Sequence, residues 1–132
     1  MQLSENDKTL LLSKKEDIRK ISSDIFLLLD EPKKNRTQIL NLINQIVGNL
    51  SDLSAISNYL CSEPDIRTFR RDFGDIQVMF EQDGTKFILR NDIERFCNRA
   101  NSITFFENVS ILSKIEIKLE SLVSIFPFKF GK

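Results

Sequence analysis

The chain has 132 residues with a formal net charge of zero, of which 41% are hydrophobic and 29% are charged. This length and composition are typical of one globular domain, and we expect residues 1–132 to fold as a single unit. Zero net charge excludes attraction to nucleic acid or to an anionic membrane by the field of the whole protein, so such binding needs a local basic patch.

The targeting and redox signals favour a cytoplasmic protein. The first apolar run, 10–12, is too short for a signal peptide, and the longest, 25–29, is far below the ~20 residues of a membrane helix. Cys61 and Cys97 are expected to be reduced thiols rather than a disulfide. We therefore expect no membrane association.

A long helix is predicted at the start of the chain, beginning at Ser4 or at Ser13, where 13–16 form a capping box. It ends before Pro32, because proline cannot continue the backbone hydrogen bonds of a helix. Its apolar side chains recur at spacings of three and four and form one stripe: Ile18, Ile21, Ile25 and Leu28.

Two further helices are predicted in the segment that follows. The first covers 35–47 and places isoleucines on one side, with Gly48 as its C-cap. The second covers 51–60, because Ser51 can cap a new helix. Short connections of this kind favour antiparallel packing between neighbouring helices.

A change of period is predicted after the fourth helix. That helix runs from Pro64 to Gly74, with apolar residues at helical spacing. From 76 to 90 apolar and polar residues alternate around Asp83 and Gly84, a pair typical of a tight type I′ turn. The sequence therefore predicts a small antiparallel β-hairpin over about residues 76–90.

The rest of the chain predicts two more helices. One begins at Asn91, and the last begins near Thr104 and ends before Pro127. The apolar stripe of the last helix consists of Leu112, Ile115, Leu119, Leu122 and Phe126. Together these elements predict a mainly α fold, a helical bundle of five or six helices with one small antiparallel β-hairpin.

Nothing in the sequence indicates an active site. The chain has no histidine, which removes the commonest general base and zinc ligand. Two cysteines cannot complete a tetrahedral zinc site, and the four glycines form no phosphate-binding loop. We therefore expect no enzyme activity, no metal, no cofactor and no small-molecule substrate.

The clearest candidate site is a run of arginines in the predicted fourth helix. Arg67, Arg70 and Arg71 share its outer face at spacings of three and four, and Phe69 and Phe73 point inward. Three guanidiniums close together can neutralise two or three backbone phosphates of a nucleic acid without global positive charge. The alternative is a solvated basic face that pairs with nearby acids. Those acids are Glu63, Asp65, Asp72 and Asp75.

Aromatic side chains near predicted helix ends form a second candidate site. They are Phe105, Phe106, Phe128 and Phe130. Phenylalanines are commonly core residues, and the alternative is a surface that binds a protein partner or a second copy of the chain.

Residues 51–90 resemble a winged helix-turn-helix, and the stretch 67–73 is similar to the recognition helix of DeoR-type repressors. The hairpin around Asp83 and Gly84 would be the wing. The resemblance implies DNA contacts in or beside the major groove. The residues that it would bring to DNA are Arg67, Thr68, Arg70 and Arg71, with Lys86 near the wing tip.

A second resemblance covers more of the chain. Segments 38–46 and 119–126, together with the Phe-Gly-Lys terminus, resemble the small helical subunit of type III-A CRISPR effector complexes. That family implies a non-enzymatic bundle in an antiviral complex, which lines the guide–target duplex and touches its backbone rather than its bases.

We therefore predict a non-enzymatic interaction or assembly subunit that binds RNA or DNA backbone through the face of Arg67, Arg70 and Arg71. One alternative is a winged-helix DNA-binding regulator that dimerises through its long terminal helices. Another is a protein-binding module of immunity or antitoxin type.

Overall fold

The computed structural model of the protein describes residues 4–58, 60–82 and 86–104, and these ranges contain four α-helices and no β-strand. The helices are α1 (Glu5–Leu28), α2 (Arg36–Ile56), α3 (Glu63–Phe80) and α4 (Lys86–Ile103). The predicted mainly helical bundle is confirmed for these residues.

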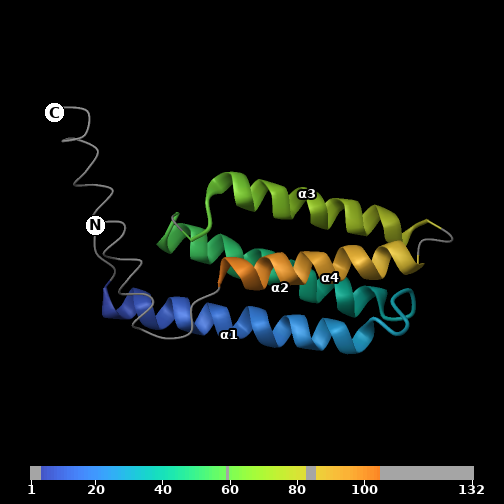
Figure 1. Cartoon of the computed structure of the whole chain (residues 1–132), viewed down its shortest axis with the longest axis horizontal. Helices are drawn as coiled ribbons and strands as arrows, with labels where there is room; N and C mark the ends of the chain where they lie inside the picture. Colours follow the sequence, from blue (N-terminus) through green and yellow to red (C-terminus); the bar gives the residue numbers. More distant parts are fainter. Residues whose placement is uncertain (1–3, 59, 83–85, 105–132) are drawn as a thin grey trace.

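The four helices run alternately up and down in one bundle (Figure 1). The helix α2 packs between α1 and α3, and α4 closes the bundle by packing against both α3 and α1. Consequently α1 and α3 lie diagonally across the bundle. One end of the bundle holds the α1–α2 connection, the end of α3 and the start of α4, and the other end holds the α2–α3 connection.

The core is built from the apolar stripe of each helix. Phe96 is the largest fully buried side chain, and its ring meets that of Phe69 edge to face, with centroids 5.2 Å apart. The stripe predicted for α1 is largely confirmed, since Ile18, Ile21 and Ile25 are buried. Burial of side chains of this size is the main stabilising contribution to such a bundle.

Capping side chains fix where α1 and α3 begin. Ser4 accepts a hydrogen bond from the Asp7 amide at 3.0 Å, so α1 starts at the earlier of the two predicted positions. Ser62 and Asp65 form a reciprocal capping box at the start of α3. Asp65 is therefore engaged with the backbone rather than with an arginine.

Lys33 in the α1–α2 connection caps the far end of α3. Its ammonium donates to the carbonyl oxygen of Phe80 at 2.8 Å and also to those of Met79 and Gln82. A cation at a helix C-terminus satisfies unpaired carbonyls and interacts favourably with the helix dipole. This contact joins the two connections at the same end of the bundle.

The predicted break at Gly48 is wrong, because α2 runs through it and merges the helices expected over 35–47 and 51–60. Gly48 is exposed, and a Cβ added there would meet no atom within 4 Å. The buried stripe continues on both sides of it, through Ile46, Leu50 and Leu53. This burial outweighs the ~1 kcal/mol cost of glycine inside a helix.

The predicted hairpin over 76–90 is also wrong. Gly74 does not end α3, and Ile76 and Phe80 are buried as the continuation of its apolar stripe. Val78, which the hairpin would have placed on the same side, is 58% exposed. Residues 76 and 80 fit a period of two and a helical spacing of four equally well. The helix forms because the two residues continue the buried stripe that begins at Ile66 and Phe69.

The start of α4 corrects the other half of that prediction. The helix begins at Lys86 rather than at Asn91, because Leu89 is buried one turn ahead of Ile93. Asp83 and Gly84 lie outside the described residues. The winged-helix hypothesis loses the strands that its wing required.

The count of five or six helices is not supported by the four helices of the described ranges. The helix predicted to begin near Thr104 and to end before Pro127 falls mostly outside them. Among the described helices, none has the length and hydropathy of a membrane span.

Candidate functional site

The three predicted arginines lie on the solvent side of α3, and all three are exposed. However, they do not line one common surface. Arg67 and Arg70 point toward α2, where they line a polar groove, whereas Arg71 lines a different depression toward α4. The bundle therefore divides the predicted site in two.

We call the space between the end of α2 and the start of α3 the arginine groove. It is an open polar groove of about 550 Å³. Its lining residues are Ser51, Ser54, Ala55, Asn58, Glu63, Ile66, Arg67 and Arg70. Two arginines stand against one glutamate, so the groove carries a local positive charge in a neutral protein.

One contact sets the register across the groove. The Arg70 guanidinium donates to the Ser51 hydroxyl at 3.2 Å. Because α2 and α3 are antiparallel, one turn along from this contact brings Ser54 opposite Arg67. Ser54 in turn donates to the side-chain oxygen of Asn58 at 3.2 Å. The groove thus holds one guanidinium–hydroxyl contact, between Arg70 and Ser51, with the Ser54 hydroxyl and Arg67 one helical turn along it.

Arg71 belongs to a charge-balanced cluster between α3 and α4. Its Nε lies 3.7 Å from a carboxylate oxygen of Asp72, which also accepts from Arg99. Arg99 stacks over the ring of Phe69, 5.3 Å from its centroid. The depression there, of about 220 Å³, is lined by three arginines and three aspartates, so it offers no net charge to an anion. This part of the site fits the alternative of a basic face paired with acids.

The other predicted nucleic-acid residues do not join the groove. Thr68 is half-buried, and its hydroxyl donates to the Pro64 carbonyl at 3.0 Å, within its own helix. Lys86 begins α4, at the opposite end of the bundle from Arg67. The predicted partner-binding residues Phe105, Phe106, Phe128 and Phe130 lie outside the described residues.

Sequence reasoning missed the α2 wall of the arginine groove. The sequence predicts Ser51 as a helix cap and assigns no role to Ser54 or Asn58. The available signal was the spacing of three between Ser51 and Ser54, which places both hydroxyls along one flank of a helix, with Asn58 four residues further on. Recognising the flank required knowing that α2 continues past Gly48.

The two cysteines are buried, free thiols. Burial raises the pKa of both Cys61 and Cys97 to about 11, so they remain protonated at neutral pH. A protonated, buried thiol is a poor nucleophile and a poor metal ligand. No group of three potential ligands suited to a metal ion occurs among the side chains of 4–58, 60–82 and 86–104.

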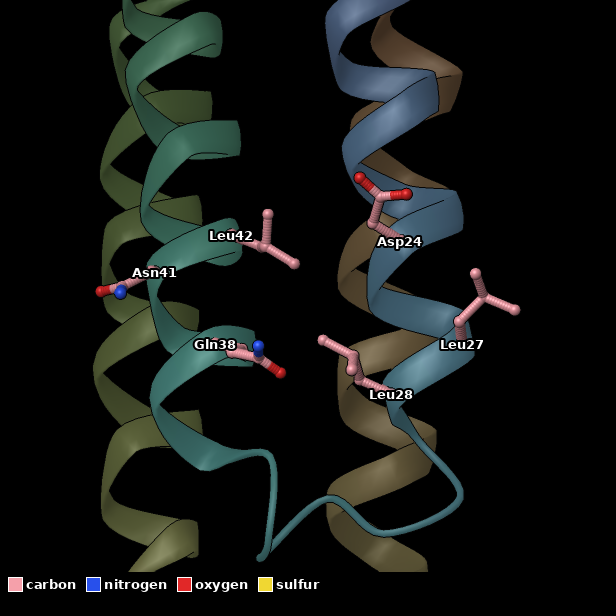
Figure 2. A pocket seen from close by; sticks show the side chains of 6 residues that line it. All are labelled: Asp24, Leu27, Leu28, Gln38, Asn41 and Leu42. Carbon is pink, nitrogen blue, oxygen red and sulfur yellow. The ribbon is translucent and has the colours of Figure 1, made fainter.

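A second, apolar groove lies between α1 and α2, at the other end of the bundle. We call it the leucine groove; it is open to solvent and has a volume of about 400 Å³. Its lining residues are Asp24, Leu27, Leu28, Gln38, Asn41 and Leu42. Figure 2 shows Leu28 and Leu42 pointing into the space between the helices. Leu27 is 79% exposed at its edge.

Other large apolar side chains stay exposed at the same end of the bundle. They are Phe26, Val78, Phe87 and Ile88. Exposed apolar side chains that gather in one region are typical of a surface that contacts protein. The arginine groove and the leucine groove are therefore at opposite ends of the described bundle.

Comparisons of the chain with protein-family models, with curated proteins and with solved structures find no match. The geometry of the two grooves is consequently the basis for a functional proposal.

Proposed function

We propose that the protein is a non-enzymatic interaction subunit that binds the sugar–phosphate backbone of a nucleic acid in the arginine groove. The observation that carries this proposal is the alignment of Arg67 and Arg70 opposite a row of hydroxyls, in an open groove with local positive charge. Guanidinium and hydroxyl groups are among the side chains that contact phosphate oxygens in protein–nucleic acid complexes.

The surroundings of Arg67 and Arg70 support this role. Arg67 is exposed and forms no ion pair with another described residue. Among the described residues, Arg70 contacts the neutral Ser51 hydroxyl and no carboxylate, so none of them cancels its positive charge. Both guanidiniums are available to an anion, unlike those of Arg71 and Arg99 in the balanced cluster.

The two levels of the groove can contact more than one phosphate. Residues at i and i+3 on a helix lie roughly 4.5 Å apart along its axis and on the same face. Arg67 and Arg70 therefore present two cationic groups in line along the groove. This arrangement suits two successive phosphates of one strand and carries no base-specific contact.

The resemblance to the small helical subunit of type III-A CRISPR complexes is consistent with the same proposal. It implies backbone contact without catalysis, within an assembly of several chains. A protein-binding module is the second candidate, and the leucine groove together with the exposed apolar end is the observation in its favour.

Fluorescence-polarisation binding to labelled single-stranded RNA and duplex DNA, over a range of salt, tests the proposal. Two phosphate contacts predict a slope of log K against log salt of about −1.4 for a single strand. The variant Arg67→Gln/Arg70→Gln is expected to lose binding more than tenfold. The control Arg19→Gln/Lys20→Gln removes the same charge from α1, across the bundle, and should change binding less than threefold.

Equal losses in the two double variants would show that net charge, and not the arginine groove, governs binding. Absence of binding to both nucleic acids at low salt would reject the proposed function and leave the protein-binding module.

A further inference from the structure

We propose that the leucine groove is the docking site of this chain's own C-terminal segment, residues 109–126. The proposal is independent of nucleic-acid binding, because the leucine groove and the arginine groove lie on opposite flanks of α2. It rests on the shape and polarity of the seam between α1 and α2 and on the length and pattern of the chain that follows α4.

A further exposed leucine lies on the same side of α1, beyond the leucine groove. Leu10 and Leu28 are 18 residues apart on α1, which is five full helical turns, so they point in the same direction. Leu10 is 43% exposed and Leu28 is half-buried. The ion pair of Lys14 with Asp52, at 2.9 Å, bridges α1 and α2 between them. The seam from Leu10 to Leu28 is thus about 27 Å long, with leucines at its two ends and the Lys14–Asp52 ion pair between them.

The segment after α4 has the length to span that seam and an apolar stripe that can cover the leucines at its ends. Eighteen residues in a helix span about 27 Å. The apolar stripe predicted within 109–126 repeats at three and four from Leu112 to Phe126. An amphipathic segment of this kind is stabilised when its stripe packs against an apolar surface.

The chain also leaves α4 within reach of the seam. Asn101 of α4 contacts Ser22 of α1 at 2.9 Å, so α4 ends directly beside α1. The five steps from residue 104 to residue 109 span up to about 17 Å when extended. Neighbouring helices lie roughly 8–10 Å apart, so this connection is long enough to cross α1 and enter the seam.

Charges at the edge of the seam complement the segment. Asp17 and Asp24 are exposed on α1, one helical heptad apart, and neither forms an ion pair with another described residue. Lys114 and Lys118 lie on one flank of the predicted stripe. Packed along α1, that flank brings ammonium groups to the free carboxylates.

Paramagnetic relaxation in the full-length protein tests the docking. A nitroxide is attached to Asn41→Cys, at the edge of the leucine groove, and in a matched sample to Val78→Cys on α3, diagonally across from α1. The buried native thiols, with their raised pKa, react slowly with the reagent. We expect a several-fold loss of amide signal within 109–126 from the label at residue 41 and little loss from the label at residue 78.

Equal effects of the two labels, or no effect of either, would overturn the proposal. A third sample mixes spin-labelled chains without isotope with isotope-labelled chains without the spin label. Signal loss within 109–126 in that sample would assign the leucine groove to the segment of a second copy, which also overturns docking within one chain.

Discussion

The arginine groove and the leucine groove share one wall, α2, and differ in almost every property. Toward α3 the second half of α2 presents Ser51 and Ser54, and toward α1 its first half presents Gln38 and Leu42. The fully buried stripe of α2 separates these flanks. One helix can therefore carry a polar surface and an apolar surface that are energetically independent, provided that the core between them is intact.

The largest expected effect comes from breaking that shared core. Phe96→Ala removes a fully buried ring that packs on Phe69, under the α3 helix. We expect the free energy of unfolding to fall by about 3–5 kcal/mol, measured by urea denaturation, because a large cavity replaces the ring. Ile88→Ala, at a position 55% exposed on the same helix, is the control and should cost less than ~1 kcal/mol. Similar losses in both variants would contradict the core assigned to α4.

Charge reversal in the arginine groove should affect that groove and leave the leucine groove unchanged. Arg67→Glu/Arg70→Glu is expected to weaken single-strand RNA binding by more than tenfold, because two cations that face phosphates become anions. The unfolding midpoint and the relaxation pattern of residues 109–126 should not change. A simultaneous loss of segment docking would show that the two grooves are energetically coupled rather than independent.

The amphipathic stripes predicted much of this architecture and also produced its largest error. The isoleucines of α1 and the arginine run of α3 fall where periodicity predicts them. The hairpin failed because Ile76 and Phe80 satisfy both periods, and a turn signal at Asp83 and Gly84 cannot decide between two strands and two helices.

The split of the arginine face was beyond sequence reasoning for a different reason. Helical spacing puts Arg67, Arg70 and Arg71 on one side of α3, but only the packing of neighbouring helices decides which acids each one meets. Asp72 and Arg99 are 27 positions apart in the sequence, and their contact places a second arginine and its acid beside Arg71, on the α4 side of α3. Likewise, Ser51 and Ser54 face the arginines only because α2 and α3 pack antiparallel in this register, which the sequence alone does not give.

A smaller effect is expected from a polar change in the leucine groove. Leu27→Asp places a charge at a position 79% exposed, so the bundle should keep its stability within ~0.5 kcal/mol. Docking of residues 109–126 should weaken several-fold, because a carboxylate then lies beside an apolar stripe. Hydrogen exchange of that segment, compared with the native chain, measures the change. Unaltered RNA affinity is expected, and unaltered exchange would argue against the proposed occupant.

The smallest expected effect concerns the hydrogen bond between Arg70 and Ser51 across the arginine groove. Ser51→Ala removes the acceptor that holds Arg70, at a contact open to solvent. If the hydroxyl only positions the guanidinium, RNA affinity should change less than threefold, because the freed side chain still reaches the phosphate. A loss near tenfold in the same polarisation titration would mean that Ser51 itself donates to the backbone, which would make α2 a ligand-binding wall of the groove. Gln45→Ala, an exposed polar residue on the same helix, controls for the general effect of substituting α2.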